Sequence, residues 1–256
     1  MADLSKLEEI VTALRGEHGC PWDKKQTPQT LKNYLLEEVY ELVEAIEEDN
    51  PEAVKEELGD VLFILVFLAH IYKERKQFEL KHAIAHGAAK MIRRHPHVFG
   101  DMHPDSIEEI HAKWQEIKSQ EKPCRKSLLD GIPKNLPALM LAYKIGKKAA
   151  KVGFDWERVD DVLEKVAEET EEFKSSLKTG ETEKIKEELG DILFSWVNVA
   201  RLLKIQPEDA LRQTIQKFKR RFQFIEAELK KQKKSLETAS LKDMDALWEK
   251  AKEKRQ

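Results

Sequence analysis

The chain contains 256 residues, of which 41% are hydrophobic and 36% are charged, with only 10 glycines and 9 prolines. This composition supports a sizeable core and favours long helices with solvated outer faces over sheets joined by tight turns. The net charge of -3 excludes a general attraction to nucleic acid polymers, so any phosphate binding must depend on local clusters of cations.

No segment of the sequence predicts export or membrane insertion. The amino terminus, MADLSKLEEI, lacks an apolar signal core. The most apolar run covers residues 61–69 and is far shorter than the roughly 20 residues that a membrane span needs. Cys20 and Cys124 lie far apart and match no paired zinc spacing. We therefore expect a soluble, cytoplasmic protein with reduced cysteines.

The sequence predicts an internal duplication. The hexapeptide KEELGD at 55–60 recurs letter for letter at 186–191, which is 131 residues later. The pattern Glu-Glu-x-x-Glu at 37–41 recurs at 168–172 with the same offset. With small gaps, three more pairs of segments correspond: 22–23 with 154–155, 90–94 with 217–221, and 114–118 with 248–252. A six-residue match with ordered neighbours indicates two copies of one unit.

Three segments follow from the duplication. We predict a first repeat over 1–121, a connector over 122–136 and a second repeat over 137–256. Proline and glycine punctuate the connector, as is typical of a break between helices. Neither repeat contains a credible strand, so the predicted fold is all-α, with two tandem four-helix units.

In the second repeat, the apolar periodicity predicts two helices that form an antiparallel hairpin. Apolar residues recur every three or four positions over 162–177 and again over 185–203. Thr179 and Gly180 lie between the two runs and predict a tight loop. Two more helices are expected, at roughly 207–231 and 241–254.

Two lines of polar residues follow the predicted hairpin, one on each helix. They are Lys165, Glu169, Glu172 and Ser176, and then Lys184, Glu188, Asp191, Ser195 and Asn198. Acidic patterns in a chain with 48 acidic residues are usually solvated faces. These lines, however, border the apolar stripe of each helix, so antiparallel packing brings four carboxylates together beside a core.

Crowded carboxylates repel one another and require a counter-charge. The second repeat contains no histidine and no cysteine, which argues against zinc and against His- or Cys-based catalysis. Oxygen-only ligands suit Mg²⁺, with Mn²⁺ as a substitute. The sequence therefore favours a magnesium site.

Cations and an aromatic ring in the same repeat suit a polyphosphate ligand. Lys217 and Arg221 lie four residues apart on one predicted helix, and Trp248 and Lys252 lie four apart on the last. A tryptophan can stack on a base, and the cations can pair with phosphate. A solvated basic face and a core tryptophan are the ordinary alternatives. Together with the acids, these residues indicate a site for a magnesium-bound nucleotide.

At this point the sequence resembles the MazG family of nucleoside triphosphate pyrophosphohydrolases, an all-α group that uses magnesium. The resemblance covers nearly the whole chain and includes both acidic pairs and three further segments: GCPWD at 19–23, RHPHVF at 94–99 and SLLDGIP at 127–133. It implies metal ligation by Glu169, Glu172, Glu188 and Asp191. It also implies nucleotide contacts by Lys165, Lys184, Lys217, Arg221, Trp248 and Lys252.

The resemblance further implies a homodimer and cleavage of nucleoside triphosphates between the α and β phosphates, with broad tolerance of base. Glu168 and Glu187 lie beside the ligand set and are candidates to orient the attacking water.

The two repeats share the four acids but differ in the residues around them. The first keeps four acids, Glu38, Glu41, Glu57 and Asp60, which predicts a second, weaker metal site. The other members of its polar lines are replaced by Tyr34, Ala45, Ala53, Ile64 and Phe67. We expect catalysis in the second repeat, and a regulatory or dimer-forming role with low activity for the first. The histidines around Pro96 are interpreted as ordinary turn residues.

Two other functions stay open on the sequence. One is a narrower dUTPase-like nucleotidase, which shares this arrangement of carboxylates. The other is a non-catalytic nucleotide sensor that acts through a partner protein. Turnover of several triphosphates with magnesium would distinguish the main interpretation from both.

Overall fold

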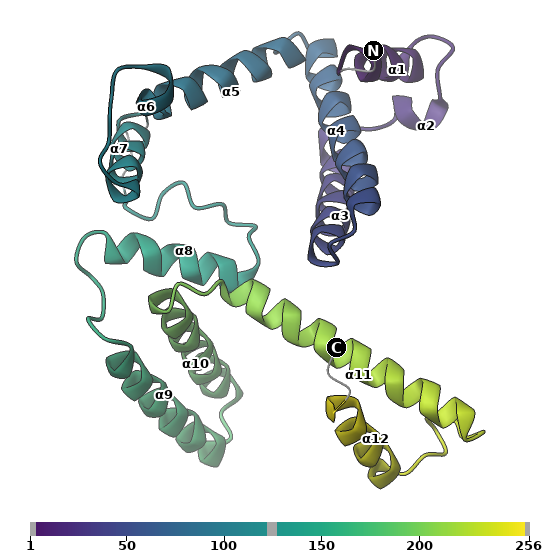
Figure 1. Cartoon of the computed structure of the whole chain (residues 1–256), viewed down its shortest axis with the longest axis vertical. Coiled ribbons are helices and arrows are strands. Elements are labelled where there is room, and N and C mark those ends of the chain that lie inside the picture. The colour runs from purple at the N-terminus through teal and green to yellow at the C-terminus, as the bar shows by residue number, and fades with distance from the viewer. Residues whose placement is uncertain (1–3, 122–126, 254–256) are drawn as a thin grey trace. The chain divides into compact units, whose positions relative to one another are not determined.

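The computed structural model describes residues 4–121 and 127–253. Twelve helices and no strand occur in these two ranges, which confirms the all-α prediction. The chain divides into two compact units, Met1–Pro123 and Cys124–Gln256 (Figure 1). Residues 122–126 of the expected connector, including Cys124, lie outside the described residues. None of the described helices is long and apolar enough to cross a bilayer.

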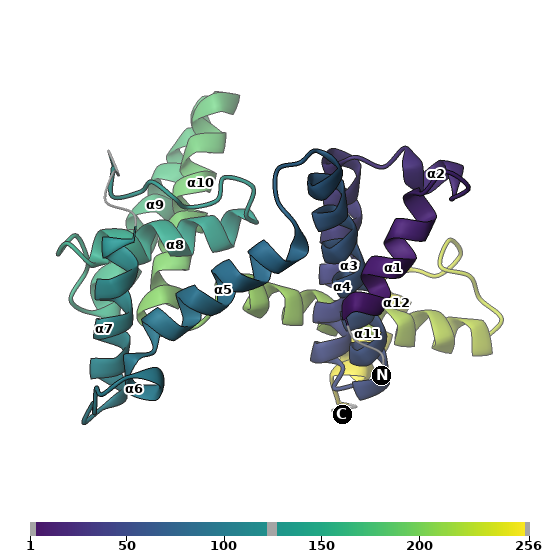
Figure 2. The same ribbon diagram turned by 90° about the horizontal axis from the view of Figure 1, so that it is seen from above.

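The first unit begins with a small helical layer and a long hairpin. Helices α1 (Leu4–Arg15) and α2 (Pro21–Lys24) precede α3 (Pro28–Glu47) and α4 (Pro51–Glu74). Both long helices start at a capped proline: Thr27 accepts from the backbone N–H of Thr30, and Asn50 accepts from that of Ala53. Figures 1 and 2 agree that α3 and α4 lie side by side.

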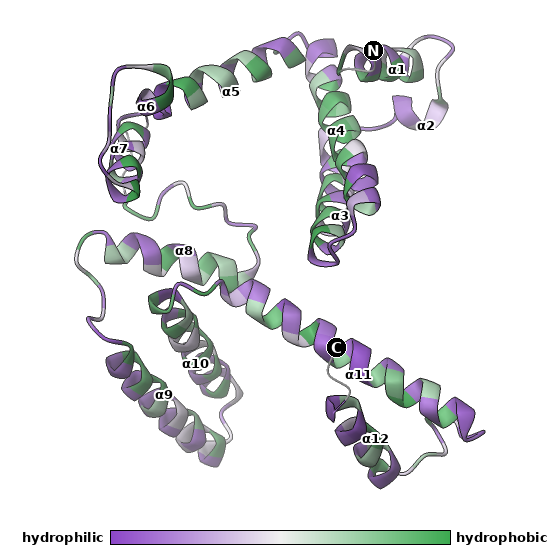
Figure 3. Cartoon of the chain, viewed as in Figure 1, coloured by the Kyte–Doolittle hydropathy of each residue, from purple (hydrophilic) through white to green (hydrophobic). Residues whose placement is uncertain are grey.

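The core of the first unit is formed mainly by the apolar half of α4, which is hydrophobic in Figure 3. The buried residues of this core are Val11 of α1, Leu31 of α3, and Ile64, Val66, Phe67 and Ile71 of α4. Helix α5 (Leu80–Arg94) then leads away from α4 to the short α6 (Pro96–Phe99) and to α7 (Ile107–Gln120). Helix α5 ends before His95, because the residue that precedes a proline is disfavoured in the α conformation. Pro96 is then the first residue of α6.

The second unit contains α8 (Ala138–Ala150), α9 (Val159–Thr179), α10 (Thr182–Leu202), α11 (Pro207–Lys231) and α12 (Leu241–Glu253). The predicted hairpin is present as α9 and α10, and the predicted later helices as α11 and α12. Gly180 ends α9 with φ of 71°, a left-handed conformation that glycine adopts without strain.

The helices of the second unit pack as two hairpins with separate cores. Val162, Val166 and Val199 form the core between α9 and α10, whereas Ile225, Leu229 and Leu247 form the core between α11 and α12. Helix α8 packs against both α10 and α11. The four helices that follow α8 therefore do not close around one common core within a single chain (Figure 1).

Candidate active site

The hairpin of the second unit gathers three carboxylates into one cluster. Glu169 and Glu172 lie one turn apart on α9, and Glu188 lies on α10. Each offers an oxygen atom, and these atoms all lie within 4.8 Å of one another. Glu169 and Glu188 are buried, with 6% and 8% of their surface exposed, while Glu172 is exposed. The cluster thus lies at the edge of the core and opens to solvent through Glu172.

The electrostatics of this cluster favour a cation. Burial, together with the neighbouring charge of Glu172, raises the pKa of Glu188, and Lys184 opposes that rise. Lys165 Nζ lies 2.9 Å from Glu169 Oε1 and 2.9 Å from Glu168 Oε1, and these hydrogen bonds raise the pKa of Lys165. Lys165 compensates only part of the negative charge. Three oxygen donors in partial burial fit a hard divalent cation.

The other predicted acids lie around this cluster. Asp191 is exposed one turn beyond Glu188 on α10 and is not among the three residues whose oxygens meet. Glu187 is exposed, and Glu168 pairs with Lys165 on the outer face of α9. The assignment of Asp191 as a metal ligand, and of Glu168 or Glu187 as the residue that orients water, stays a prediction.

The polar lines continue into the core, as the periodicity predicted. Ser176, Ser195 and Asn198 are all buried, at 1%, 5% and 2% exposure. Ser176 Oγ donates to the carbonyl of Phe173, and Asn198 Nδ2 donates to that of Phe194. These bonds satisfy the hydroxyl of Ser176 and the amide of Asn198 inside the hairpin.

An ion pair that the sequence analysis did not identify supports Asn198. Arg201 Nε donates to Asn198 Oδ1 over 3.1 Å, and Arg201 Nη1 donates to Asp155 Oδ2 over 2.9 Å. The Arg201 side chain is only 8% exposed, and its hydrogen bonds lower the pKa of Asp155. Gly146 of α8 leaves room for this arrangement, because a Cβ there would lie 2.9 Å from Arg201 Nε. The sequence did contain a signal for Asp155, because the pair Phe154-Asp155 of the second repeat corresponds to Trp22-Asp23 of the first.

Of the predicted nucleotide contacts, Lys165 and Lys184 lie beside the acids on α9 and α10, and the other four lie on the α11–α12 hairpin. Lys217 is exposed on α11, and the guanidinium of Arg221 lies 5.5 Å from the centre of the Trp248 ring. Trp248 also packs against Phe218 and the apolar core of α11 and α12. Lys252 Nζ pairs with Glu249 over 2.6 Å.

Within one chain, these residues are not assembled with the acidic cluster. Helix α12 packs on α11, while α9 packs on α10, and Figure 1 shows the two hairpins diverging from α8. The structure therefore gathers the carboxylates in one place and the cations with the tryptophan in another.

The first unit contains a similar acidic cluster. Oxygens of Glu38, Glu41 and Glu57 approach one another within 4.8 Å. Burial raises the pKa of Glu38, and the charge of Asp60 raises it further. Tyr34 stands where the second repeat has Lys165, and Ile64 and Phe67 are buried where it has Ser195 and Asn198. Three of the residues that replace the polar lines, Ala45, Ile64 and Phe67, are thus buried in the core of the first unit.

The first unit also neutralises its own cationic cluster. Arg93 Nε and Arg94 Nε donate to the two oxygens of Glu121 over 3.0 and 3.1 Å. These bonds lower the pKa of Glu121 to about 2. The guanidinium of Arg94 lies 5.1 Å from the centre of the Trp114 ring, as Arg221 lies over Trp248. Seven residues after the tryptophan, the first repeat has Glu121, whereas the second repeat has an arginine.

Comparisons with known proteins agree with this architecture. The model of the MazG nucleotide pyrophosphohydrolase domain matches residues 26–99 and 158–223, so each match contains one acidic cluster. A Thermotoga maritima protein named nucleoside triphosphate pyrophosphohydrolase/pyrophosphatase MazG is 46% identical over 248 residues, which cover 96% of this chain and 94% of that protein.

Two further relatives cover almost the whole chain. The Escherichia coli nucleoside triphosphate pyrophosphohydrolase is 39% identical over 257 residues, with 98% of each chain covered. An uncharacterized Bacillus subtilis protein, YabN, is 50% identical over 253 residues, which cover 98% of this chain and 52% of that protein.

Proposed function

Because the chain belongs to the MazG nucleotide pyrophosphohydrolase family, we infer that it hydrolyses nucleoside triphosphates to the monophosphate and pyrophosphate. We propose that the second repeat, residues 137–256, performs this reaction, and that the first, residues 1–121, is regulatory. The observation that carries the assignment is the cluster of Glu169, Glu172 and Glu188, which lies beside the polar, buried end of the α9–α10 hairpin.

We propose that Mg²⁺ is the cation and that Asp191 completes the ligand set. When bound, Mg²⁺ would neutralise phosphate charge and lower the pKa of a coordinated water. Lys165 holds Glu169 in place through its ion pair, and the exposed Glu172 and Asp191 can turn toward an incoming phosphate. Glu168 and Glu187, which stand one residue before Glu169 and Glu188, are the proposed residues that orient water.

A homodimer accounts for the separation of acids and cations. Leu189, Leu193 and Trp196 on α10 are 46–51% exposed, although they belong to the apolar run of that helix. Such a row of exposed apolar side chains marks an interaction surface. We propose that a second copy covers this row and brings its own α11–α12 hairpin to the acids.

In that dimer, Lys217, Arg221 and Lys252 pair with phosphates, together with Lys184 beside the acids. Trp248 stacks on the base. Stacking tolerates every base, because each base presents an aromatic face. This supports broad base tolerance over a preference for one pyrimidine.

A panel of triphosphates in ¹⁸O-labelled water tests the reaction. With Mg²⁺, ATP, GTP and dUTP should each release pyrophosphate, and the label should enter the monophosphate. Orthophosphate as the first product, or turnover of dUTP alone, would contradict the proposal.

Complementation between variants tests the composite site. Asp191→Ala and Lys217→Ala/Arg221→Ala chains should each be inactive alone. Mixed after unfolding and refolding together, they should regain activity, because a heterodimer contains one site with intact acids and intact cations. If both variants are folded and dimeric but their mixture stays inactive, the acids and cations do not meet between chains.

A further inference from the structure

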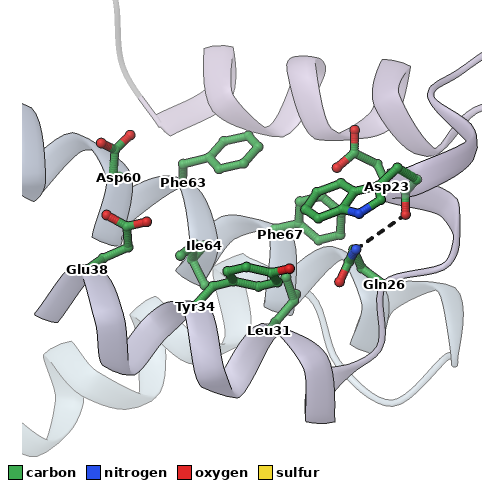
Figure 4. Close-up of a pocket in the computed structure, with 10 residues that line it drawn as sticks. Asp23, Gln26, Leu31, Tyr34, Glu38, Asp60, Phe63, Ile64 and Phe67 are labelled. Atoms are coloured by element: carbon green, nitrogen blue, oxygen red, sulfur yellow. Dashed lines mark hydrogen bonds between the residues drawn. The ribbon is translucent and has the colours of Figure 1, made fainter.

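The second unit contains a pocket that lies apart from its acidic cluster. It is formed between α8 and the start of α11, and its volume is about 350 Å³. The lining residues are Met140, Tyr143, Lys144, Lys147, Gln206 and Asp209. None of them belongs to the acidic hairpin of α9 and α10. The pocket of the first unit, in contrast, is lined by Glu38 and Asp60 and belongs to the acidic site already described (Figure 4).

Tyr143 brings an accessible hydroxyl group to this pocket. Only 8% of the residue is exposed, so its ring is largely buried. The hydroxyl forms no hydrogen bond with any described residue, yet it is not enclosed by protein atoms. The small exposed part of Tyr143 therefore includes its polar end. A tyrosine hydroxyl can donate one hydrogen bond, and buried tyrosines usually have a partner for it, so this hydroxyl is available to a ligand.

Two lysines on the same wall have no anionic partner. Lys144 and Lys147 lie one turn apart on α8, and both are exposed. Within residues 4–121 and 127–253, neither forms an ion pair or a side-chain hydrogen bond. The adjacent Lys148 differs, because its Nζ donates to the carbonyls of Leu128 and Asp130 over 2.8 and 2.6 Å. The fold thus uses one lysine of this turn and leaves the two that line the pocket uncompensated.

The opposite wall of the pocket is polar as well. Gln206 precedes the first residue of α11, and its side chain does not cap that helix. Asp209 is exposed in the first turn of α11 and forms no ion pair in the part of the chain that the structure describes, although it lines the same pocket as the lysines. An ionised carboxylate only accepts hydrogen bonds, so Asp209 suits hydroxyl groups of a ligand.

The corresponding face of the first repeat is used by the fold itself. With the offset that aligns the Trp-Asp and Phe-Asp pairs, Tyr143 corresponds to Val11, which is a core residue with 0% exposure. Lys147 corresponds to Arg15, which donates to both carboxylate oxygens of Glu74. The second repeat therefore leaves a hydroxyl and a cation available where the first repeat has a buried side chain and an ion pair.

We propose that this pocket binds a sugar phosphate. Lys144 and Lys147 pair with its phosphate, and Asp209 accepts hydrogen bonds from its sugar hydroxyls. A phosphate monoester carries a charge of about −1.5 to −2 at pH 7, which two ammonium groups match. The volume of about 350 Å³ lies within the range of small-molecule sites and exceeds what a bare phosphate ion needs. The ring of Tyr143 is largely buried, so the pocket presents no exposed aromatic face to a nucleobase.

The binding of a sugar phosphate here does not rest on the reaction proposed for the acidic cluster. It does affect the same helix, because Lys217 and Arg221 follow Asp209 on α11. At 1.5 Å per residue, Lys217 lies about 12 Å further along the helix axis. A ligand that joins α8 to the first turn of α11 would hold the base of the helix that carries these cations.

Isothermal titration calorimetry of the full chain with ribose 5-phosphate tests the proposal, in the presence of EDTA so that no divalent cation recruits phosphate to the acids. Ribose 5-phosphate should bind at one site per chain. Its affinity should exceed that of inorganic phosphate and of ribose at least about tenfold, because each lacks the hydrogen bonds of one end to a charged group. No binding of ribose 5-phosphate at millimolar concentration, or equal affinity for inorganic phosphate, would overturn the proposal.

Variants of the pocket locate the site. Lys144→Gln/Lys147→Gln should weaken the binding of ribose 5-phosphate at least about tenfold, because charge-assisted hydrogen bonds to phosphate are lost. Its melting temperature should equal that of wild type, since neither side chain forms a bond in the described fold. Asp209→Ala should reduce the preference for ribose 5-phosphate over inorganic phosphate, because it alters only the sugar end.

The matched control is Lys217→Gln/Arg221→Gln, which removes two cations from the same unit but outside the pocket, and it should leave the binding of ribose 5-phosphate unchanged. Full binding in the Lys144→Gln/Lys147→Gln variant, or loss of binding in the control, would overturn the assignment. Adenosine monophosphate distinguishes a free sugar phosphate from a nucleotide. If it binds more tightly than ribose 5-phosphate and loses that affinity in the Lys144→Gln/Lys147→Gln variant, the ligand is a nucleotide and the proposal is wrong.

Discussion

The most informative perturbation removes the same two acids from each repeat in turn. The double variant Glu172→Ala/Asp191→Ala removes the exposed acid of the second cluster together with Asp191, one turn beyond Glu188, and Glu41→Ala/Asp60→Ala removes the corresponding acids of the first repeat. We expect the first of these variants to abolish triphosphate hydrolysis and the second to retain most of it. A sequence motif alone would score both repeats as active, so the outcome depends on what surrounds the acids.

The magnitude follows from the geometry of the second cluster. Three carboxylates share a space in which their oxygens lie within 4.8 Å, so one cation would depend on all of them. Changes to residues that only support metal ligands typically cost about 10- to 100-fold. The loss of Glu172 together with the proposed ligand Asp191 should therefore cost at least about 100-fold in kcat/KM, or roughly 2.7 kcal/mol of transition-state stabilisation.

Stability should respond in the opposite direction. The charge of Glu172 raises the pKa of the buried Glu188, so its removal relieves repulsion in the metal-free protein. The melting temperature without metal should therefore stay the same or rise. Wild type should gain stability when Mg²⁺ is added, because a ligand that binds only the folded state stabilises it, and the second-repeat variant should lose part of that gain.

The assay is pyrophosphate release from ATP and GTP as Mg²⁺ is titrated, with circular dichroism and sedimentation as controls for folding and assembly. Two results would refute the reasoning. One is a first-repeat variant that loses activity while it stays folded and correctly assembled. The other is a second-repeat variant that keeps activity near that of wild type.

Three further predictions concern packing, charge and substrate binding. Gly146→Ala should lower the free energy of unfolding by up to about 2 kcal/mol in urea denaturation, because its Cβ would lie 2.8 Å from Asn198 Oδ1 and 2.9 Å from Arg201 Nε. Overpacking costs about 1–3 kcal/mol and exceeds the helix-propensity gain of about 1 kcal/mol, so an unchanged or higher stability would contradict this packing. Glu121 has a depressed pKa, so its pairing stabilises the fold fully above pH 4.5 and is lost as the pH falls to about 2. Denaturation across that range should therefore show the stability difference from Glu121→Gln shrinking toward acid, and a constant difference would speak against the ion pair. Trp248→Ala should lower kcat/KM for all triphosphates by a similar factor of roughly 10 to 100, since a stacked base contributes about 1–3 kcal/mol; a loss confined to one base would indicate recognition of base edges instead.

Much of the fold could be predicted from the sequence, because the helices and the duplication are local or periodic properties. The apolar repeat placed the α9–α10 hairpin, and Gly180 marked the turn between its helices. The same periodicity placed Glu169 and Glu172 on one face and placed Ser195 and Asn198, which are buried, in a line beside the apolar stripe. Helical spacing fixes which side chains share a face, so these inferences needed no tertiary information.

Tertiary structure alone decided how residues from different elements meet. The pairing of Arg201 with Asp155, across 46 positions of sequence, depends on the space left at Gly146, which no motif predicts. The separation of the α11–α12 hairpin from the acids depends on where each hairpin finds its own core.

The buried Asp23 belongs to the same class of result. The sequence aligns Asp23 with Asp155, yet the carboxylate of Asp155 pairs with Arg201, whereas Arg15 donates to the backbone carbonyl of Asp23. The difference arises because Arg15 reaches its position from α1 and is directed to Glu74, whereas Arg201 extends from α10 toward Asp155. Residue spacing determines which groups a helix presents, but the packing of one helix on another determines which charged groups pair with one another.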